Sequence, residues 1–116
     1  STHRLNVFKR SPWRKSAADE QKASYEWWNS KFPSYSLINS EIRKLGSKEV
    51  VLDDFQIDAS AMDPGLSGVF RMNLLYESSG LEITCLASDG ENGRLFPSKR
   101  KARTCWDILN SFAYIN

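Results

Sequence analysis

Four basic side chains stand close together near the end of the sequence, at Lys99, Arg100, Lys101 and Arg103. They follow Ser98, a residue type that caps the first turn of a helix. Cations at that position are unfavourable without a counter-ion, because the helix macrodipole already places partial positive charge there. A helix N-terminus lined with Lys and Arg is therefore suited to phosphate binding. The alternative is a solvated basic face that has no ligand.

The helix that these residues would open is amphipathic. Ala102, Cys105, Trp106 and Leu109 recur at helical spacing and predict one apolar stripe. Cys105 and the second cysteine, Cys85, are too few for a disulfide framework, and both fall on the apolar side of a predicted element. Buried free thiols are the favoured interpretation and a bridge is the alternative. Free thiols indicate a reducing compartment inside the cell, either cytoplasm or nucleus.

The totals fit one globular domain. The chain has 116 residues, of which 41% are hydrophobic and 26% charged, as is usual for soluble proteins. We find no apolar run of membrane-spanning length and no signal peptide, and so expect no membrane partner. The net charge is only +2, but the two ends of the chain are basic and the stretch 47–93 is acidic. Such a polarised molecule presents one surface that attracts anions.

Residues suited to catalysis or metal binding are sparse. The only histidine, His3, lies near the start of the chain, so no histidine-based triad or metal cluster is available. Cys85 and Cys105 lack the spacing of metal ligands, and no glycine-rich nucleotide loop is present. We therefore expect a chain that is not an enzyme and needs neither a cofactor nor a metal.

The first third of the chain predicts an arm and a helix. Residues 1–15 are basic and aperiodic, which is typical of a flexible arm or linker. Ser16 begins a capping-box-like start, so 16–32 is expected to form an N-terminal extension helix. Trp28 shares one side of this helix with other apolar residues and is expected in the core. Trp27 points elsewhere and is the candidate contact with another protein or a neighbouring domain.

The rest of the chain predicts a helix, three strands and the basic helix. Apolar residues at helical spacing favour a helix over 35–45, which Gly46 would end. Alternating apolar residues then predict strands over about 50–59, 70–77 and 81–87. Both helices must bury an apolar stripe, and the meander offers one apolar face. We therefore predict an α+β fold, an α-β-β-β-α sandwich with two helices on one face of a three-stranded antiparallel sheet, plus the extra N-terminal helix.

At this point the sequence resembles the double-stranded RNA-binding domain family. Its last helix opens with a serine, two basic residues, any residue, an alanine and a basic residue, which matches Ser98-Lys99-Arg100-Lys101-Ala102-Arg103. Pro33 followed by Ser36-Leu37-Ile38-Asn39 is similar to the start of the family's first helix. The resemblance implies a family-like domain over 33–116.

The resemblance also implies a function and its site. The chain would be a module of a larger RNA-processing or RNA-remodelling protein, and it would recognise double-stranded RNA by shape through phosphate and 2′-hydroxyl contacts. Lys99, Arg100 and Arg103, with Lys101 beside them, would contact phosphates across the major groove. The polar residues of the first helix would contact one minor groove, namely Ser36, Asn39, Ser40 and Arg43. The loop that holds Pro64 and Gly65 would contact the next minor groove.

A second hypothesis follows from departures from the family pattern. Ser40 stands where the family usually has glutamate, and the loop around Pro64 lacks the usual histidine and carries Asp63. The helix with Trp27 lies outside the shared region. The alternative is a degenerate domain that serves protein–protein or interdomain contact through that helix.

Overall fold

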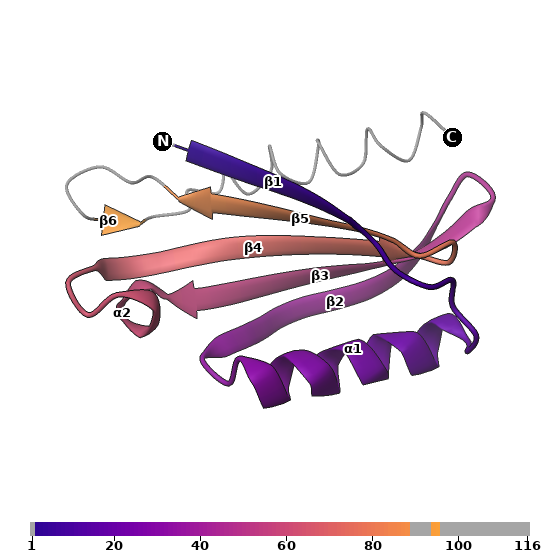
Figure 1. The fold of residues 1–116 in the computed structure, drawn as a ribbon, viewed down its shortest axis with the longest axis horizontal. Coiled ribbons are helices and arrows are strands. Elements are labelled where there is room, and N and C mark those ends of the chain that lie inside the picture. Colours follow the sequence, from indigo (N-terminus) through magenta and orange to yellow (C-terminus); the bar gives the residue numbers. More distant parts are fainter. Residues whose placement is uncertain (1, 89–93, 96–116) are drawn as a thin grey trace.

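The computed structural model describes residues 2–88 and 94–95, and its main element is an antiparallel sheet (Figure 1). Five strands lie in the order β1-β5-β4-β3-β2. Their bounds are Thr2–Lys9 for β1, Tyr35–Leu45 for β2, Lys48–Asp58 for β3, Ser67–Glu77 for β4 and Leu81–Ser88 for β5. A short strand, β6 (Arg94–Leu95), pairs in parallel with the start of β4. In this part of the chain the helices are α1 (Ala17–Lys31) and α2 (Ala59–Met62).

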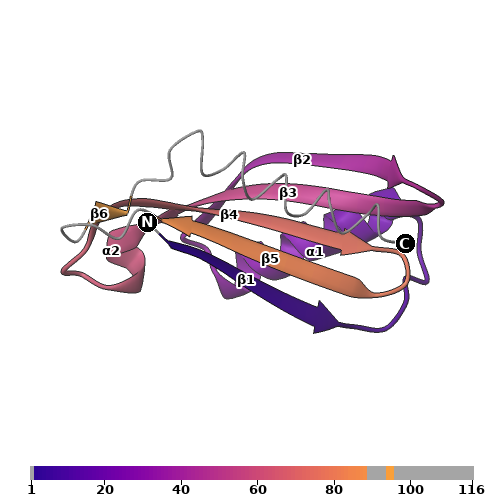
Figure 2. The same ribbon diagram turned by 90° about the horizontal axis from the view of Figure 1, so that it is seen from above.

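The predicted three-stranded sandwich with two helices on one face is wrong. The three predicted strands exist as β3, β4 and β5 and pair as an antiparallel meander. Two further strands extend the sheet, however, because β2 pairs with β3 and β1 pairs with β5. Figure 2 shows β1 and β2 at opposite edges, with α1 behind the sheet. The chain therefore crosses from one edge to the other through α1.

The helix predicted over 35–45 is strand β2. It pairs with β3 from Tyr35 opposite Ile57 to Leu45 opposite Lys48, with a register shift between Leu37 and Asn39. Gly46, with φ of +66°, stands in the tight turn between the two strands instead of ending a helix. Aromatic and β-branched residues favour strands, and the hairpin gives this segment a full ladder of hydrogen bonds. The apolar pattern of this segment allows a helix or a strand, and pairing with β3 in the hairpin decides for the strand.

The predicted flexible arm is also part of the sheet. Residues 2–9 form β1, which pairs with β5 along its whole length. The chain then stays attached to the turn between β4 and β5. The backbone N–H of Arg10 donates to the carbonyl of Gly80 over 2.7 Å, and that of Trp13 donates to the carbonyl of Ser78 over 3.0 Å. This segment is thus fixed close to α1.

Helix α1 confirms the helix predicted over 16–32. Ser16 caps it, since its hydroxyl accepts from the backbone N–H of Asp19 over 3.2 Å. Trp28 packs against the core as predicted, with its ring centroid 5.6 Å from that of Phe55. Tyr25, one turn before Trp28 in the helix, is exposed.

Both faces of the sheet are buried, although the sequence predicts one. Tyr76 of β4 stands opposite Glu82 of β5, and Leu75 stands opposite Ile83. Because side chains alternate between faces, this register puts the even-numbered apolar residues of β4 and the odd-numbered ones of β5 on opposite sides. One cluster faces α1 and contains Val51, Phe55, Ile57, Met72 and Leu74. The other contains Val50, Leu52, Leu75 and Ile83.

Two further predictions concern the cysteines and the membrane. Cys85 is fully buried and disulfide-bonded, so the prediction of a free thiol is wrong for this residue. Cys105 lies outside the described residues. The argument for a reducing compartment therefore loses its basis. In the part of the chain that the structure describes, no helix is long and apolar enough to cross a membrane.

Candidate functional site

A pocket of about 210 Å³ opens between α1, the segment that follows β1 and the turn between β4 and β5. Its walls carry the aromatic rings of Trp13, Trp27, Trp28 and Tyr76. Its charged lining residues are Arg10, Glu20, Glu77 and Glu82. We refer to the site formed by these eight residues as the aromatic pocket. Aromatic walls with a few charged groups are typical of binding sites.

The backbone around Gly80 positions one wall of the aromatic pocket. Gly80 has φ of +101°, and a Cβ there would collide with the Arg10 carbonyl, lying 2.9 Å from its carbon. Only glycine allows this approach, which brings Arg10 and Trp13 against the turn. The ring of Trp13 then packs edge-on against Tyr76, with centroids 6.0 Å apart.

Trp27 forms the outer wall of the aromatic pocket. Its side chain lies edge-on against Trp28, with ring centroids 5.0 Å apart, and also contacts Phe32. Trp28 in turn packs on the core, so Trp27 rests on a rigid neighbour. Trp27 nevertheless remains 43% exposed. The prediction that it points away from the core is confirmed, whereas its role in partner contact stays a prediction.

Arg10 links this wall to a buried carboxylate. Its Nη2 lies 2.9 Å from Oε2 of Glu82, and its guanidinium carbon lies 5.7 Å from the ring centroid of Trp27. Burial raises the pKa of Glu82, while the charge and hydrogen bond of Arg10 act in the opposite direction. The pocket therefore already holds one cation, between an aromatic face and an acid.

A second buried acid, Asp53, lies between α1 and the sheet. It accepts a hydrogen bond from the hydroxyl of Ser40, which itself accepts from Nε2 of Gln21 over 2.6 Å. Burial raises the pKa of Asp53 to about 6, and the nearby hydroxyl groups of Ser40 and Tyr76 offset part of that rise. These polar groups connect the helix to β2 and β3.

The hydroxyl of Tyr76 lies between Asp53 and the aromatic pocket. Burial raises the pKa of Tyr76 strongly, and the negative charge of Asp53 raises it further. The hydroxyl interacts with Asp53 and Ser24 closely enough to affect that pKa, yet it completes a hydrogen bond of normal geometry with neither. Tyr76 therefore brings an unsatisfied polar atom to the pocket wall.

The residues predicted to contact a minor groove do not share a helix face. Ser36, Asn39, Ser40 and Arg43 all lie on strand β2. Ser40 pairs with Asp53 and Asn39 pairs with Asp54, so their side chains stand on opposite faces of the sheet. The hydroxyl of Ser40 is bound under α1, and Arg43 forms an ion pair of 2.7 Å with Glu41. The helical surface that the sequence predicts for them is absent from this segment.

The other predicted RNA contacts are placed as follows. Pro64 and Gly65 lie between α2 and β4, where the backbone N–H of Gly65 donates to Oδ1 of Asp63 over 2.9 Å. This is the turn that the sequence predicts. The basic residues of the predicted phosphate site lie outside the described residues: Lys99, Arg100, Lys101 and Arg103.

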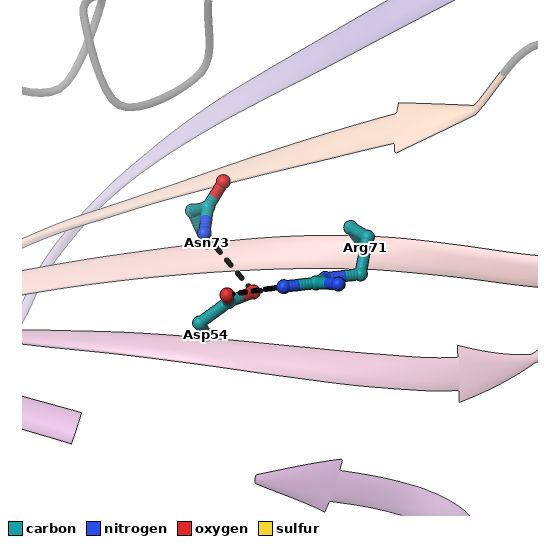
Figure 3. A network of polar contacts seen from close by, with 3 residues as sticks. All are labelled: Asp54, Arg71 and Asn73. Carbon is teal, nitrogen blue, oxygen red and sulfur yellow. Dashed lines mark hydrogen bonds and ion pairs between the residues drawn. The ribbon is translucent and has the colours of Figure 1, made fainter. Parts of the chain in front are cut away.

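A separate polar cluster lies on β3 and β4 (Figure 3). Asp54 accepts from Arg71 through Nε at 3.2 Å and Nη2 at 2.5 Å, and from Nδ2 of Asn73 at 3.3 Å. Because Asp53 faces α1, its neighbour Asp54 faces the other side of the sheet. The Oδ1 atom of the fully buried Asn73 has no hydrogen-bond partner. This cluster is an ion pair within the sheet, and its residues do not line the aromatic pocket.

Sequence reasoning missed most of the aromatic pocket. Arg10 and Trp13 lie in the stretch 1–15, for which the sequence predicts a flexible arm, and Glu82 is a charged residue within the predicted strand 81–87. The sequence signal for the site was the excess of aromatic residues over 13–28, next to the acids Asp19 and Glu20. No group of three or more His, Cys, Asp or Glu side chains in the described ranges is arranged to hold a metal ion.

Comparisons with known proteins add no family to this picture. No protein-family model matches the sequence, and a search of curated proteins found no match. The resemblance of residues 98–103 to the double-stranded RNA-binding domain therefore rests on the sequence motif alone.

Proposed function

We propose that this chain is a protein-binding module that contacts a partner protein or a neighbouring domain through the aromatic pocket. The observation that carries the proposal is the position of Trp27. Its indole is held against Trp28 and Phe32, yet a large part of it faces solvent. Tryptophan is enriched among the residues that contribute most binding energy in interfaces.

The surroundings of Trp27 support the same function. Phe32, which follows the last residue of α1 and contacts Trp27, is also exposed, so the apolar surface extends beyond one side chain. Trp27 is flanked by other groups, namely the rings of Trp28 and Phe32 and the guanidinium of Arg10. A side chain that is ordered before binding loses little conformational entropy on binding.

Binding of duplex RNA remains a prediction from the sequence motif. Among the described residues, the polar side chains expected at a minor groove lie on a strand, and one of them, Ser40, is bonded to Asp53. The geometry therefore favours protein contact over RNA contact.

The two functions are separated by one pair of binding experiments. Peptides selected on the intact chain from a random display library should lose about tenfold or more in affinity for Trp27→Ala. Met62→Ala is the matched control, because Met62 is an exposed apolar residue on α2, away from the pocket. The chain is also titrated with a generic RNA duplex of about 20 base pairs at two salt concentrations.

Protein contact is contradicted if the selected peptides bind Trp27→Ala and the wild-type chain equally well. Salt-dependent binding of the RNA duplex, with no peptide selected, would favour the RNA hypothesis instead.

A further inference from the structure

We propose that the aromatic pocket binds an organic cation, an alkylammonium or guanidinium group, at a position that Arg10 occupies in the isolated chain. The inference deepens the proposed function and rests on it for one point: the natural source of the cation is a basic side chain of the partner protein. The binding chemistry itself follows from the pocket.

The rings of the pocket are arranged to surround a cation. Trp27 and Trp28 are nearly perpendicular, with an interplanar angle of 86°, and Trp13 meets Tyr76 at 64°. The pocket wall is therefore formed by rings in several orientations. The face of an aromatic ring carries negative potential, which attracts ammonium and guanidinium groups within about 6 Å of its centroid.

The charges of the pocket also favour a cation. Its lining holds three carboxylates, from Glu20, Glu77 and Glu82, against one guanidinium, from Arg10. Lys48, outside the lining, pairs with Glu77 at 3.6 Å, so the formal charge of these two cations and three anions is −1. Glu82 is buried, so its charge is poorly screened by water. An incoming anion would meet Arg10 but also three acids.

Arg10 shows that a guanidinium fits the position. It stacks over Trp27 and pairs with Glu82 at the same time. Its side chain is 55% exposed, and its backbone is held independently by the hydrogen bond to Gly80. The side chain can therefore leave while the chain path stays fixed. Its departure would uncover both the face of Trp27 and the carboxylate of Glu82.

The hydroxyl of Tyr76 provides independent support for a ligand. The side chain is more than nine-tenths buried, its oxygen lacks a completed hydrogen bond, and it lines the pocket. Buried polar atoms are nearly always satisfied in native proteins. Its lone pairs can accept from the N–H groups of a bound ammonium or guanidinium.

The test uses choline, a cation without N–H groups, as the probe of attraction by the rings and carboxylates, and its uncharged tert-butyl analogue as the control. Binding is followed by NMR through the indole N–H signals of Trp13 and Trp27. We expect choline to shift these signals in the wild-type chain, and to bind about tenfold more tightly to Arg10→Ala, in which the internal cation is gone. The neutral analogue should shift neither protein, and Glu82→Gln should weaken choline binding.

Further binding measurements identify the natural source of the cation and test whether an anion binds. Short peptides that contain one arginine or one lysine should bind more tightly than choline if a partner side chain is the natural ligand. Choline binding as tight as that of the peptides would indicate a free amine instead. Inorganic phosphate is the anionic probe and should not bind.

Three results would overturn the inference: no cation binds to Arg10→Ala, the neutral analogue binds as well as choline, or phosphate binds in place of the cations. Thermal unfolding checks that Arg10→Ala is folded, and Arg10→Gln gives a second variant. If cations fail to bind but selected peptides still require Trp27, only this inference falls. If cations bind and the peptides ignore Trp27, the proposed function falls.

Discussion

Asp53 and Asp54 are neighbours on β3, yet they stand in opposite environments. Asp53 faces α1, accepts from Ser40 and lies near the hydroxyl of Tyr76, with no cation bonded to it. Asp54 faces the other side of the sheet and is bound by the guanidinium of Arg71 and the amide of Asn73 (Figure 3). Both carboxyl groups are buried. The alternation of side chains along a strand is enough to produce this difference.

Asp54 is therefore a structural acid, whereas the protonation state of Asp53 can change with pH. A buried carboxylate with a bidentate arginine has its charge balanced within the fold, so it holds two strands together. A buried carboxyl that only hydroxyl groups contact is unfavourable in its charged form, which is why the pKa of Asp53 is raised. Asp53 also connects, through Tyr76, to the wall of the aromatic pocket. The protonation state on the side of the sheet that carries the pocket therefore changes with pH.

The largest expected effect comes from removing the cation of the structural pair. Arg71→Ala leaves Asp54 buried without its partner, and should lower the free energy of unfolding by about 3 kcal/mol or more. Chemical denaturation at neutral pH measures this. The double variant Asp54→Leu/Arg71→Met removes both charges and should recover most of the loss.

Arg10→Ala is the comparison on the pocket side. Its ion pair with Glu82 is half-exposed at the arginine, so the expected loss is below about 1 kcal/mol. Equal losses for Arg71→Ala and Arg10→Ala would contradict the distinction between the two sides of the sheet.

A loss smaller than that of Arg71→Ala, but larger than that of Arg10→Ala, is expected from the glycine that shapes the pocket. In Gly80→Ala the new Cβ would collide with the carbonyl of Arg10. The substitution should therefore lower the free energy of unfolding by about 2–3 kcal/mol. Gly46→Ala is the matched control, because Gly46 also has a positive φ but has no atom within 4 Å of the added Cβ. Its cost should be about 1 kcal/mol, from the left-handed backbone alone. Denaturant unfolding measures both variants. If Gly80→Ala lowers the free energy of unfolding no more than Gly46→Ala does, the close approach to Arg10 does not contribute to the loss.

Local signals in the sequence predicted part of this fold. The N-cap at Ser16, the turn at Asp63 and the three strands of the meander were all readable, because each depends on residues close together in the chain. The segment 35–45 was not, since its apolar residues fit a helix and a strand, and the pairing with β3 decides between them. The strand at residues 2–9 was missed for the same reason, because its partner, β5, lies more than seventy residues further along the chain.

The candidate site was less predictable than the fold. Trp27 was identified from helical spacing, which places it off the core side of α1. A meander with one apolar face would put the apolar Tyr76 and the charged Glu82 on different faces, but the β4–β5 register places them opposite each other on one face. A shift of one residue in register exchanges the two faces, and composition does not fix that register. The pocket therefore became visible only with the paired strands and the segment that follows β1.

The last prediction contrasts the two aspartates directly. The pKa of Asp53 is raised in the folded chain, from its ordinary value of 3.8 to about 6. The favourable contribution of its neutral form is therefore fully present below the unfolded pKa and is lost as the pH rises through about 6. At neutral pH the charged carboxyl lowers the free energy of unfolding by about 3 kcal/mol, since each tenfold change in proton affinity corresponds to about 1.4 kcal/mol.

Asp53→Asn keeps an acceptor for Ser40 but cannot become charged. The variant should be more stable than the wild-type chain by about 3 kcal/mol near neutral pH, and the difference should disappear near pH 4. Asp54→Asn should do the opposite, because it weakens the pair with Arg71 and lowers stability at neutral pH. Urea unfolding of both variants across this pH range measures the contrast. A stability change of the same sign for both variants would show that the two sides of the sheet do not differ in the way that their partners imply.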